Sequence, residues 1–254
     1  MNRVNKDETV ASDLDVLLKF ELYFWFVLGI GRELVETLYN KGANVIGVSR
    51  SAGPLEELKK LMPDSRFTAL QLDLSDWNKT RETLGNINVT LDGIVNNAGI
   101  AVIKPFIEMT EEDYDSVMNV NLKAVFNVIQ TLLPKLKDGG SIVNISSLAG
   151  LCGFEGHSVY SASKAGLDAF TKNLAVEMGP RKIRVNSVNP TVILTRMGRE
   201  NWSNPVKAGP LLSRIPLRRF GEVSEVVEPI LFLLSDKSSF INGNCLPIEG
   251  GLLA

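Results

Sequence analysis

The chain has 254 residues, of which 44% are hydrophobic and 22% charged, and its formal net charge at pH 7 is −2. These values are ordinary for a soluble globular protein, and they give no broad basic surface for nucleic acid or an anionic membrane. Two cysteines, Cys152 and Cys245, and one histidine, His157, provide neither a disulfide framework nor the spacing of a metal site. We therefore expect no metal and a reducing compartment such as the cytoplasm.

The N-terminal part combines a polar segment with a short apolar run. Residues 1–13 are polar and aperiodic, and we expect a loose terminus there. The run LYFWFVLGI, Leu22 to Ile30, is too short to span a bilayer and lacks the small-residue cleavage site of a signal peptide. We interpret it as a buried strand; a targeting segment is the alternative.

From Gly29 onward, helical and strand patterns alternate. Gly29 and Gly31 open an amphipathic helix from about Ile30 to Asn40, and Gly42 ends it. Further patterns predict strands at 44–49, 67–72, 91–95, 141–145, 183–188 and 245–248, and helices at 55–61, 77–84, 111–137 and 223–234. This alternation predicts one α/β domain over residues 1–254, with a doubly wound, mostly parallel seven-stranded sheet, an atypical first strand and helices on both faces.

Several polar loops follow predicted strands directly. They are Ser49–Arg50, Asp73, NNAG at 96–99, SSLAG at 146–150 and NPT at 189–191. In a doubly wound sheet the ligand lies beyond the carboxyl ends of the strands, so these loops should converge on one rim. The stretch from Pro190 to Pro216 is predicted to be a single long loop, and loops of that length are usually lids or binding loops.

Tyr160 and Lys164 are spaced i, i+4, which places both side chains on one helix face. A phenol with a pKa near ~10 is a poor proton donor at neutral pH, and a cation one turn away should lower that pKa toward the range of acid–base catalysis. The alternative is an exposed tyrosine and lysine on an amphipathic helix, which a bare YxxxK usually means. The convergence of the polar loops favours the functional interpretation.

Together these motifs resemble the short-chain dehydrogenase/reductase family. The resemblance rests on NNAG (96–99), Asn121 within MNVNL, the double serine 146–147, YSASK (160–164) and RVNSVNP (184–190), in the family's order and spacing. It covers about Gly29 to Leu253 and implies a Rossmann-type fold. Within the family, GHSVY (156–160), NPTVILT (189–195) and RENWSNP (199–205) are similar to the dicarbonyl and L-xylulose reductase branch.

The resemblance implies a cytoplasmic, homotetrameric oxidoreductase of carbohydrate metabolism that reduces small α-dicarbonyls and ketoses such as L-xylulose with NADPH. Tyr160 would be the general acid that protonates the carbonyl oxygen, and Lys164 would lower its pKa and hold the nicotinamide ribose. Ser147 would hydrogen-bond the carbonyl, and Asn121 would fix a chain of waters that resupplies protons. The chemistry agrees, because donors aimed at a developing alkoxide stabilise its charge.

Ser49 and Arg50 decide the expected cofactor. NAD-preferring relatives place an acidic residue at the end of this strand, whereas here Ser49 precedes a cation that can pair with a 2′-phosphate. We expect NADPH rather than NADH; the alternative is a solvated arginine. Asp73 would accept from the adenine amino group, and Leu74 would pack on the ring. The other residues implied in cofactor binding are Gly29, Ile30, Gly31, Asn96, Ala98, Gly99, Tyr160, Lys164, Pro190, Thr191, Val192 and Thr195.

The implied substrate contacts are Ser147, Leu148, His157, Tyr160 and Trp202. His157 could be a polar contact in the pocket or a helix-start histidine without a ligand. Trp202 could close over a small substrate or pin its loop to the body. Leu148 is apolar where sugar-reducing relatives often carry a polar side chain, which weakens the case for a sugar and leaves a less polar dicarbonyl.

The chain departs from the family at the cofactor loop, which reads TGxxxGxG after the first strand. Counting back from Gly29 and Gly31, Phe24 and Trp25 hold the Thr-Gly positions, and Phe26, Val27 and Leu28 follow. We expect the Trp25 indole to obstruct the cofactor or to reposition the strand, although the helix N-terminus at 29–32 still offers N–H groups to an anion. Either the residues before Gly29 come from an alternative or mispredicted first exon, which we favour, or the chain binds cofactor weakly or not at all.

Two other functions stay open. One is a carbonyl or alcohol short-chain dehydrogenase with a different substrate. The other is a non-catalytic, oligomeric scaffold that kept the fold and lost cofactor binding. Trp25 favours the scaffold, whereas the joint presence of Asn121, Ser147, Tyr160 and Lys164 argues against it. In a tetramer we expect the C-terminal LPIEGGLLA to lie at a subunit interface.

Overall fold

The computed structural model describes residues 22–26 and 29–254, except for the side chains of residues 22–26, 196, 197 and 201. The predicted loose terminus at 1–13 lies outside the described residues. No helix within the described part is long and apolar enough to cross a membrane.

Seven strands of the described residues form one sheet, in the order β3-β2-β1-β4-β5-β6-β7, and each neighbouring pair is parallel. The strands are β1 (Leu22–Phe26), β2 (Asn44–Ser49), β3 (Phe67–Gln71), β4 (Leu91–Asn96), β5 (Leu136–Ile145), β6 (Arg184–Pro190) and β7 (Cys245–Ile248). The predicted doubly wound sheet is confirmed. The strand order reverses between β1 and β4, and in such sheets ligands bind in the crevice at that reversal.

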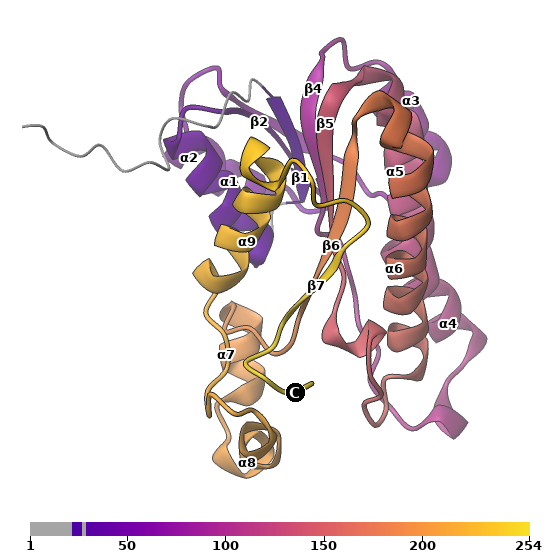
Figure 1. The fold of residues 1–254 in the computed structure, drawn as a ribbon, viewed down its shortest axis with the longest axis vertical. Coiled ribbons are helices and arrows are strands. Elements are labelled where there is room, and N and C mark those ends of the chain that lie inside the picture. The colour runs from indigo at the N-terminus through magenta and orange to yellow at the C-terminus, as the bar shows by residue number, and fades with distance from the viewer. Residues whose placement is uncertain (1–21, 27–28) are drawn as a thin grey trace, which may run out of the picture.

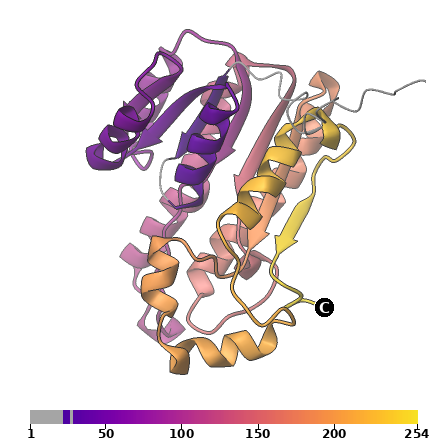
Figure 2. The ribbon, with the colours of Figure 1, turned by 90° about the vertical axis from the view of Figure 1, so that its left-hand side faces the viewer.

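Helices cover both faces of this sheet (Figures 1 and 2). One face carries α1 (Ile30–Asn40), α2 (Ala52–Leu61) and α9 (Ser224–Leu234) over a core that includes Leu34, Leu58 and Ile230. The other face carries α3 (Trp77–Gly85), α5 (Ala124–Leu132) and α6 (Ser158–Met178), with α4 (Glu111–Met118) beside α6. Its core includes Leu84, Val128 and Leu167. The apolar stripes predicted from the sequence are therefore buried against the sheet.

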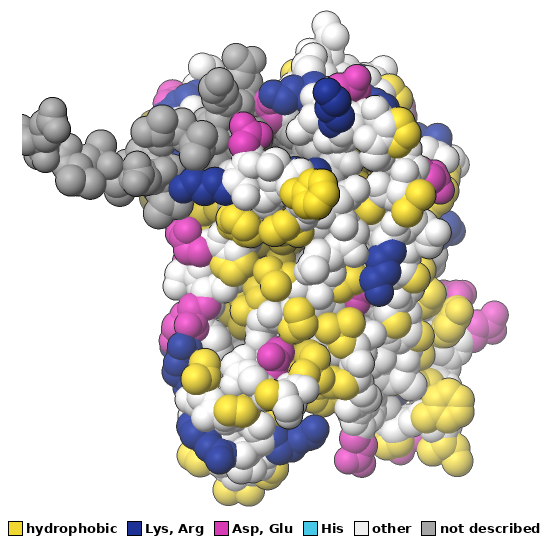
Figure 3. Space-filling view, in the orientation of Figure 1, with side chains coloured by type: hydrophobic (Ala, Val, Ile, Leu, Met, Phe, Trp, Pro, Cys, Tyr) yellow, Lys and Arg dark blue, Asp and Glu magenta, His cyan; other side chains and the backbone are white. Residues whose placement is uncertain are grey.

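Charges of both signs are interspersed on the face shown in Figure 3, around apolar side chains that run down its centre. This face therefore presents no broad basic surface, in agreement with the net charge of −2.

Two predicted elements differ from the structure. The helix predicted over 111–137 is interrupted by a π-helical turn at Asn119–Lys123 and ends in a 3-10 turn at Leu133–Lys135, after which β5 begins. Pro134 lies in that turn, where its missing N–H ends the α-helical bonding.

The stretch from Pro190 to Pro216 was predicted to be a single long loop, and this is wrong. It contains α7 (Arg196–Trp202) and α8 (Pro205–Arg214). Both begin at side-chain caps that the periodicity does not reveal. The Thr195 hydroxyl accepts from the Gly198 N–H at 3.0 Å, and the Asn204 side chain accepts from the Val206 N–H at 2.9 Å.

Arg184 joins the start of β6 to the carboxyl end of α9. It is 8% exposed, and its guanidinium donates to the carbonyl oxygens of Leu233, Leu234 and Ser235 and to the Ser238 hydroxyl, at 2.6 to 3.3 Å. Carbonyls at a helix C-terminus have no partner within the helix, and here a buried cation supplies one.

We predict that Arg184→Met destabilises the protein by about 2–4 kcal/mol, because it leaves several buried carbonyl oxygens without donors. Arg219→Met is the matched control, since Arg219 pairs with Glu225 at the surface and its loss should change stability little. Urea denaturation of both variants measures the difference. Equal stabilities would contradict this account of Arg184.

Candidate active site

The ammonium group of Lys164 is buried at the carboxyl end of β5. Lys164 is 3% exposed, and its Nζ donates to the carbonyl oxygen of Ile145 at 2.7 Å. The Ser146 hydroxyl donates to the Lys164 carbonyl oxygen at 3.2 Å, so two bonds join this turn of α6 to the strand end. Burial lowers the pKa of Lys164 to about 8, and the nearby Asp168 carboxylate opposes that shift.

Tyr160 lies one turn before Lys164, next to Ser147. A hydrogen bond links the Tyr160 and Ser147 hydroxyls, and Lys164 Nζ lies 5.8 Å from the centroid of the Tyr160 ring. The predicted pair and the predicted serine are therefore together at the rim of the sheet.

The predicted lowering of the Tyr160 pKa by Lys164 is wrong for this arrangement. Burial raises the pKa of Tyr160 above its ordinary value, and only the hydrogen bond with Ser147 acts in the opposite direction. The Lys164 ammonium instead donates to a backbone carbonyl. In the unliganded protein Tyr160 is therefore a protonated phenol at neutral pH.

Asn121 sits in the π-helical turn and is fully buried. Its side chain accepts from the Ile100 N–H at 2.8 Å and donates to the Ile100 carbonyl at 2.9 Å, so it pairs with both backbone groups of one residue. Its Nδ2 also donates to Ser163 Oγ at 3.0 Å, and that hydroxyl donates to the Tyr160 carbonyl at 2.7 Å. Asn121 thus connects the segment after NNAG to the helix that carries Tyr160.

Gly99, the last residue of NNAG, approaches both of these side chains. A Cβ at Gly99 would lie 3.4 Å from Lys164 Nζ and 3.5 Å from Asn121 Oδ1. Three predicted motifs, NNAG, the asparagine and YSASK, therefore meet at one point. Within NNAG, Asn96 is buried and donates to Asn144 Oδ1 at 2.8 Å, which ties it to the neighbouring strand, and Ala98 is partly buried.

Two predicted substrate residues lie in different surroundings. His157 caps the start of α6, and its ring lies edge-on to Tyr160 with centroids 6.1 Å apart, so it borders the site. Its Nδ1 is 2.7 Å from the Glu155 carbonyl oxygen. Leu148, in contrast, is 1% exposed, which leaves almost no side-chain surface for a substrate to contact.

Trp202, at the end of α7, packs edge-on against Phe220 with ring centroids 5.4 Å apart. Lys207 Nζ lies 5.0 Å from the Trp202 ring centroid, and the indole belongs to a small apolar cluster with Ala208 and Ile215. Trp202 thus packs against its neighbours in the region of α7 and α8, and its closure over a substrate stays a prediction.

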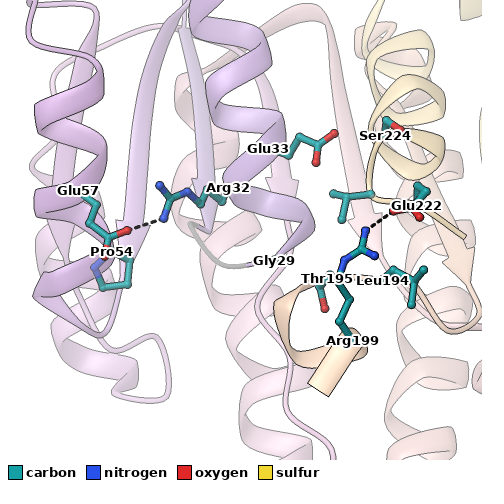
Figure 4. Close-up of a pocket in the computed structure, with 11 residues that line it drawn as sticks. Gly29, Arg32, Glu33, Pro54, Glu57, Leu194, Thr195, Arg199, Glu222 and Ser224 are labelled. Atoms are coloured by element: carbon teal, nitrogen blue, oxygen red, sulfur yellow. Dashed lines mark hydrogen bonds and ion pairs between the residues drawn. The ribbon is translucent and has the colours of Figure 1, made fainter. Parts of the chain in front are cut away.

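A pocket of about 530 Å³ opens beside the N-terminus of α1 (Figure 4). It is lined by Gly29, Arg32, Glu33, Pro54, Glu57, Leu194, Thr195, Arg199, Glu222, Val223 and Ser224. Tyr160, Ser147 and Lys164 are not part of this lining. The pocket therefore lies beside the start of α1 and apart from Tyr160, Ser147 and Lys164.

The start of α1 fits the phosphates of a dinucleotide. Gly29 has φ +59°, a conformation that side chains disfavour, and a Cβ there would lie 3.3 Å from the Thr195 methyl carbon. Within the described residues, no side chain caps this helix, and the Arg32 N–H donates to the Gly29 carbonyl oxygen at 3.2 Å, so the N–H groups of Ile30 and Gly31 are the ones available to an anion. Ile30 and Gly31 form the first turn, and Gly31 is buried.

Two arginines in this pocket were not predicted. Arg32 donates to Glu57 at 2.5 Å and to Glu36 at 2.9 Å, and Arg199 donates to Glu222 at 2.6 Å (Figure 4). The Arg32–Glu57 pair joins α1 to α2, and the Arg199–Glu222 pair joins α7 to the segment before α9. Pairings between such distant segments leave no local sequence signal. An anion entering the pocket would meet these cations together with their carboxylate partners.

The residues predicted for the adenosine end occupy strand ends as expected. Ser49 is buried at the end of β2, and Arg50 is exposed beside it. Asp73 accepts from the N–H and hydroxyl of Ser75 at 3.0 and 2.7 Å through one oxygen, Oδ1. Leu74 is 6% exposed and packs in the core, so little of its side chain remains to stack on a ring.

The segment after β6 returns to the same rim. Pro190 is buried, the Thr191 N–H donates to the Ile248 carbonyl at 3.0 Å, and the Val192 carbonyl accepts from the Gly221 N–H at 3.2 Å. Thr195 caps α7 and contacts the Gly29 position. Through Thr195, the segment after β6 therefore borders the start of α1.

The structure shows where the backbone of Phe24 and Trp25, which occupy the Thr-Gly positions of the family's cofactor loop, is placed. Phe24 and Trp25 lie within β1, paired with Ile46 and Gly47 of β2, rather than in a turn after the strand. The predicted obstruction by the Trp25 indole concerns a side chain outside the described residues, as do Val27 and Leu28. Three residues separate the end of β1 at Phe26 from the start of α1.

The lowered pKa of Lys164 predicts a pH-dependent stability difference. Since the folded state binds this proton less tightly than the unfolded chain, the contribution of Lys164 to stability rises as the pH increases from about 8 toward 10. We expect the stability of wild type minus that of Lys164→Met to increase by about 2 kcal/mol between pH 7 and pH 10.

Urea denaturation of both proteins across this pH range measures that slope. Lys172→Met is the matched control, because Lys172 lies on the same helix with its side chain in solvent. A difference for Lys164→Met that does not vary with pH would contradict the burial of a charged ammonium.

Comparison with known proteins identifies the family. Residues 27–253 match a family profile described as enoyl-(acyl carrier protein) reductase. The chain is 48% identical to L-xylulose reductase from Bos taurus over 229 residues, covering 89% of this chain and 93% of that protein. It is 43% identical to carbonyl reductase [NADPH] 2 from Sus scrofa, with the same coverage.

Solved structures agree with these sequence matches. A mutant short-chain dehydrogenase/reductase from Serratia marcescens superimposes with a TM-score of 0.85 at 28% identity, covering 92% of this chain and 98% of that one. The predicted resemblance is confirmed over the region in which it was expected. The chain belongs to the short-chain dehydrogenase/reductase family.

Proposed function

We propose that this chain is an NADPH-dependent reductase of small α-dicarbonyls and ketoses such as L-xylulose. The observation that carries the proposal is the placement of two hydrogen-bonded hydroxyls, Ser147 and Tyr160, beside the buried ammonium of Lys164. Similarity to L-xylulose reductase and carbonyl reductase over 89% of the chain supports the carbonyl class of substrate.

The residues of the site can supply every group that carbonyl reduction needs besides the hydride. A bound reduced nicotinamide supplies that hydride to the carbonyl carbon. The Ser147 hydroxyl positions the carbonyl oxygen, and Tyr160 donates its phenolic proton to the same oxygen as negative charge develops there. The raised pKa of Tyr160 keeps that proton in place until the alkoxide forms, since an alkoxide is a far stronger base than a phenolate.

Lys164 and Asn121 support the proton donor. The Lys164 ammonium, with a pKa of about 8, donates to the Ile145 carbonyl oxygen and so holds the turn of α6 that carries Tyr160 against the end of β5. Asn121 fixes the position of Ile100 and, through Ser163, the backbone of Tyr160. We propose that it also orders the waters that return a proton to the site.

The cofactor is proposed from the end of β2. Ser49 is neutral where an acidic residue would favour the 2′-hydroxyl of NAD, and the exposed Arg50 directly after the strand would pair with a 2′-phosphate. The name of the Sus scrofa relative, carbonyl reductase [NADPH] 2, agrees with this preference. A homotetramer in the cytoplasm is the assembly and location that we propose with it.

Replacing the proton donor tests the central role. We predict that Tyr160→Phe lowers kcat for diacetyl and L-xylulose by at least about 100-fold, because general acid catalysis is lost, while NADPH affinity stays nearly unchanged. Tyr114→Phe, at a tyrosine 50% exposed on α4, is the control and should retain activity. Unchanged turnover in Tyr160→Phe would remove Tyr160 as the acid.

Cofactor titration tests the proposed preference for NADPH. It also distinguishes a reductase of these substrates from an enzyme with another substrate and from a non-catalytic scaffold. Fluorescence titration should show tighter binding of NADPH than of NADH, and Arg50→Gln should weaken NADPH about tenfold while sparing NADH. Tight binding of both without turnover of either substrate would point to another carbonyl or alcohol substrate. No binding of either nucleotide would contradict the enzyme proposal and favour the oligomeric scaffold.

A further inference from the structure

A buried carboxylate lies behind the proposed proton-transfer residues. Asp168 is on α6, one turn after Lys164, and is 4% exposed. Its Oδ1 accepts from Ser187 Oγ at 2.8 Å, and its Oδ2 accepts from Asn189 Nδ2 at 2.7 Å. Burying a carboxylate costs free energy even when donors such as these satisfy it. An apolar side chain would fill the same space at a lower cost, so the buried carboxylate points to a role of Asp168 in the site.

The first link runs from Asp168 to the backbone of Ser147. Asn189 Nδ2 donates to Asp168 Oδ2 and also to the Ser147 carbonyl oxygen, the latter at 3.0 Å. Asn189 Oδ1 is 3.2 Å from the Ser187 hydroxyl. Because Asp168 only accepts, it forces the amide of Asn189 to present its NH₂ group, and the second hydrogen of that group then holds Ser147.

The second link is the close packing of the SSLAG loop on α6. A Cβ at Gly150 would lie 2.9 Å from Asp168 Oδ2 and 2.9 Å from the Lys164 carbonyl carbon, so this loop approaches the helix more closely than a side chain permits. Asp168 therefore lies where the loop bearing Ser147, the helix bearing Tyr160 and Lys164, and the end of β6 all meet.

The third link is electrostatic. The Asp168 carboxylate opposes the effect of burial on Lys164 and so keeps more of its ammonium protonated near neutral pH. Among the described residues, the other titratable groups near Asp168 are Lys172, exposed one turn later on α6, and Cys245 on β7, whose Sγ lies 4.0 Å from the Asp168 carbonyl oxygen. Burial raises the pKa of Cys245, so its thiol is neutral at that pH.

We propose that Asp168 is a positioning residue of this active site, which orients Ser147 through Asn189 and sustains the charge of Lys164. This inference rests on the proposed reductase function. Asp168 does not touch the substrate; it acts on Ser147 through a hydrogen-bond chain and on Lys164 through its charge.

The test separates the two effects with two variants. Asp168→Asn keeps the size of the side chain and removes its charge, and it should lower kcat about tenfold or more with a smaller change in KM. The basic limb of the kcat–pH profile should also move to lower pH, because Lys164 loses its proton more easily. Asn189→Ala keeps the charge and removes the link to Ser147, so it should lower kcat without moving that limb.

The free energy of unfolding, measured as a function of pH, tests the electrostatic link without relying on enzyme turnover. The pH midpoint at which wild type and Lys164→Met diverge in urea denaturation should move to lower pH when both proteins also carry Asp168→Asn. Ser187→Ala, which removes one hydrogen bond to Asp168 and leaves its charge, is the control and should leave the midpoint in place. If the protein proves not to be a reductase, this measurement still decides the electrostatic link.

Three results would overturn the inference. One is an unmoved pH limb and an unmoved stability midpoint in folded Asp168→Asn, which would make the residue merely structural. Another is an Asn189→Ala variant with the kcat of wild type. If Asp168→Asn does not fold, the Asn189→Ala result alone decides whether the link to Ser147 exists.

Discussion

The bond from the buried Lys164 ammonium to the Ile145 carbonyl oxygen determines how the rest of the site is arranged. A charge removed from water is tolerated only when hydrogen bonds and nearby charges compensate for its lost hydration. Here the carbonyl at the end of β5 gives the hydrogen bond, and Asp168 gives the opposing charge. With α6 docked in this way, Tyr160 lies one turn earlier on the helix, beside Ser147.

The part of the rim at β1 and the start of α1 depends on main-chain pairing rather than on particular side chains. β1 fills the centre of the sheet between β2 and β4, although the family match begins at residue 27, after that strand has ended. Parallel pairing uses main-chain N–H and C=O groups, which most residue types supply equally well. A segment unlike the family can thus complete the sheet and still deliver Gly29 to the start of α1, where backbone N–H groups are available to an anion.

Local patterns in the sequence predicted much of this structure. The helix at Ile30–Asn40 and the strand at Cys245–Ile248 have the predicted bounds, because apolar periodicity and flanking glycines define them. The convergence of NNAG, Asn121 and YSASK was predicted from the rule for strand ends in parallel sheets. What failed depended on tertiary burial: the direction of the Tyr160 pKa shift is set by desolvation, which no spacing reveals. The contacts of Asp168 with β6 likewise join residues 19 and 21 positions apart.

The central claim is that Ser147 and Tyr160 hold the oxygen of a carbonyl group whose carbon would receive hydride from a bound nicotinamide. Incubation of the protein with diacetyl and NADPH that carries deuterium at both C4 positions of the nicotinamide tests it directly, with the product analysed by mass spectrometry. The account predicts one deuterium on the carbinol carbon of the product, and with L-xylulose one deuterium on the new carbinol carbon. A folded protein that yields no deuterated alcohol from either substrate would contradict it.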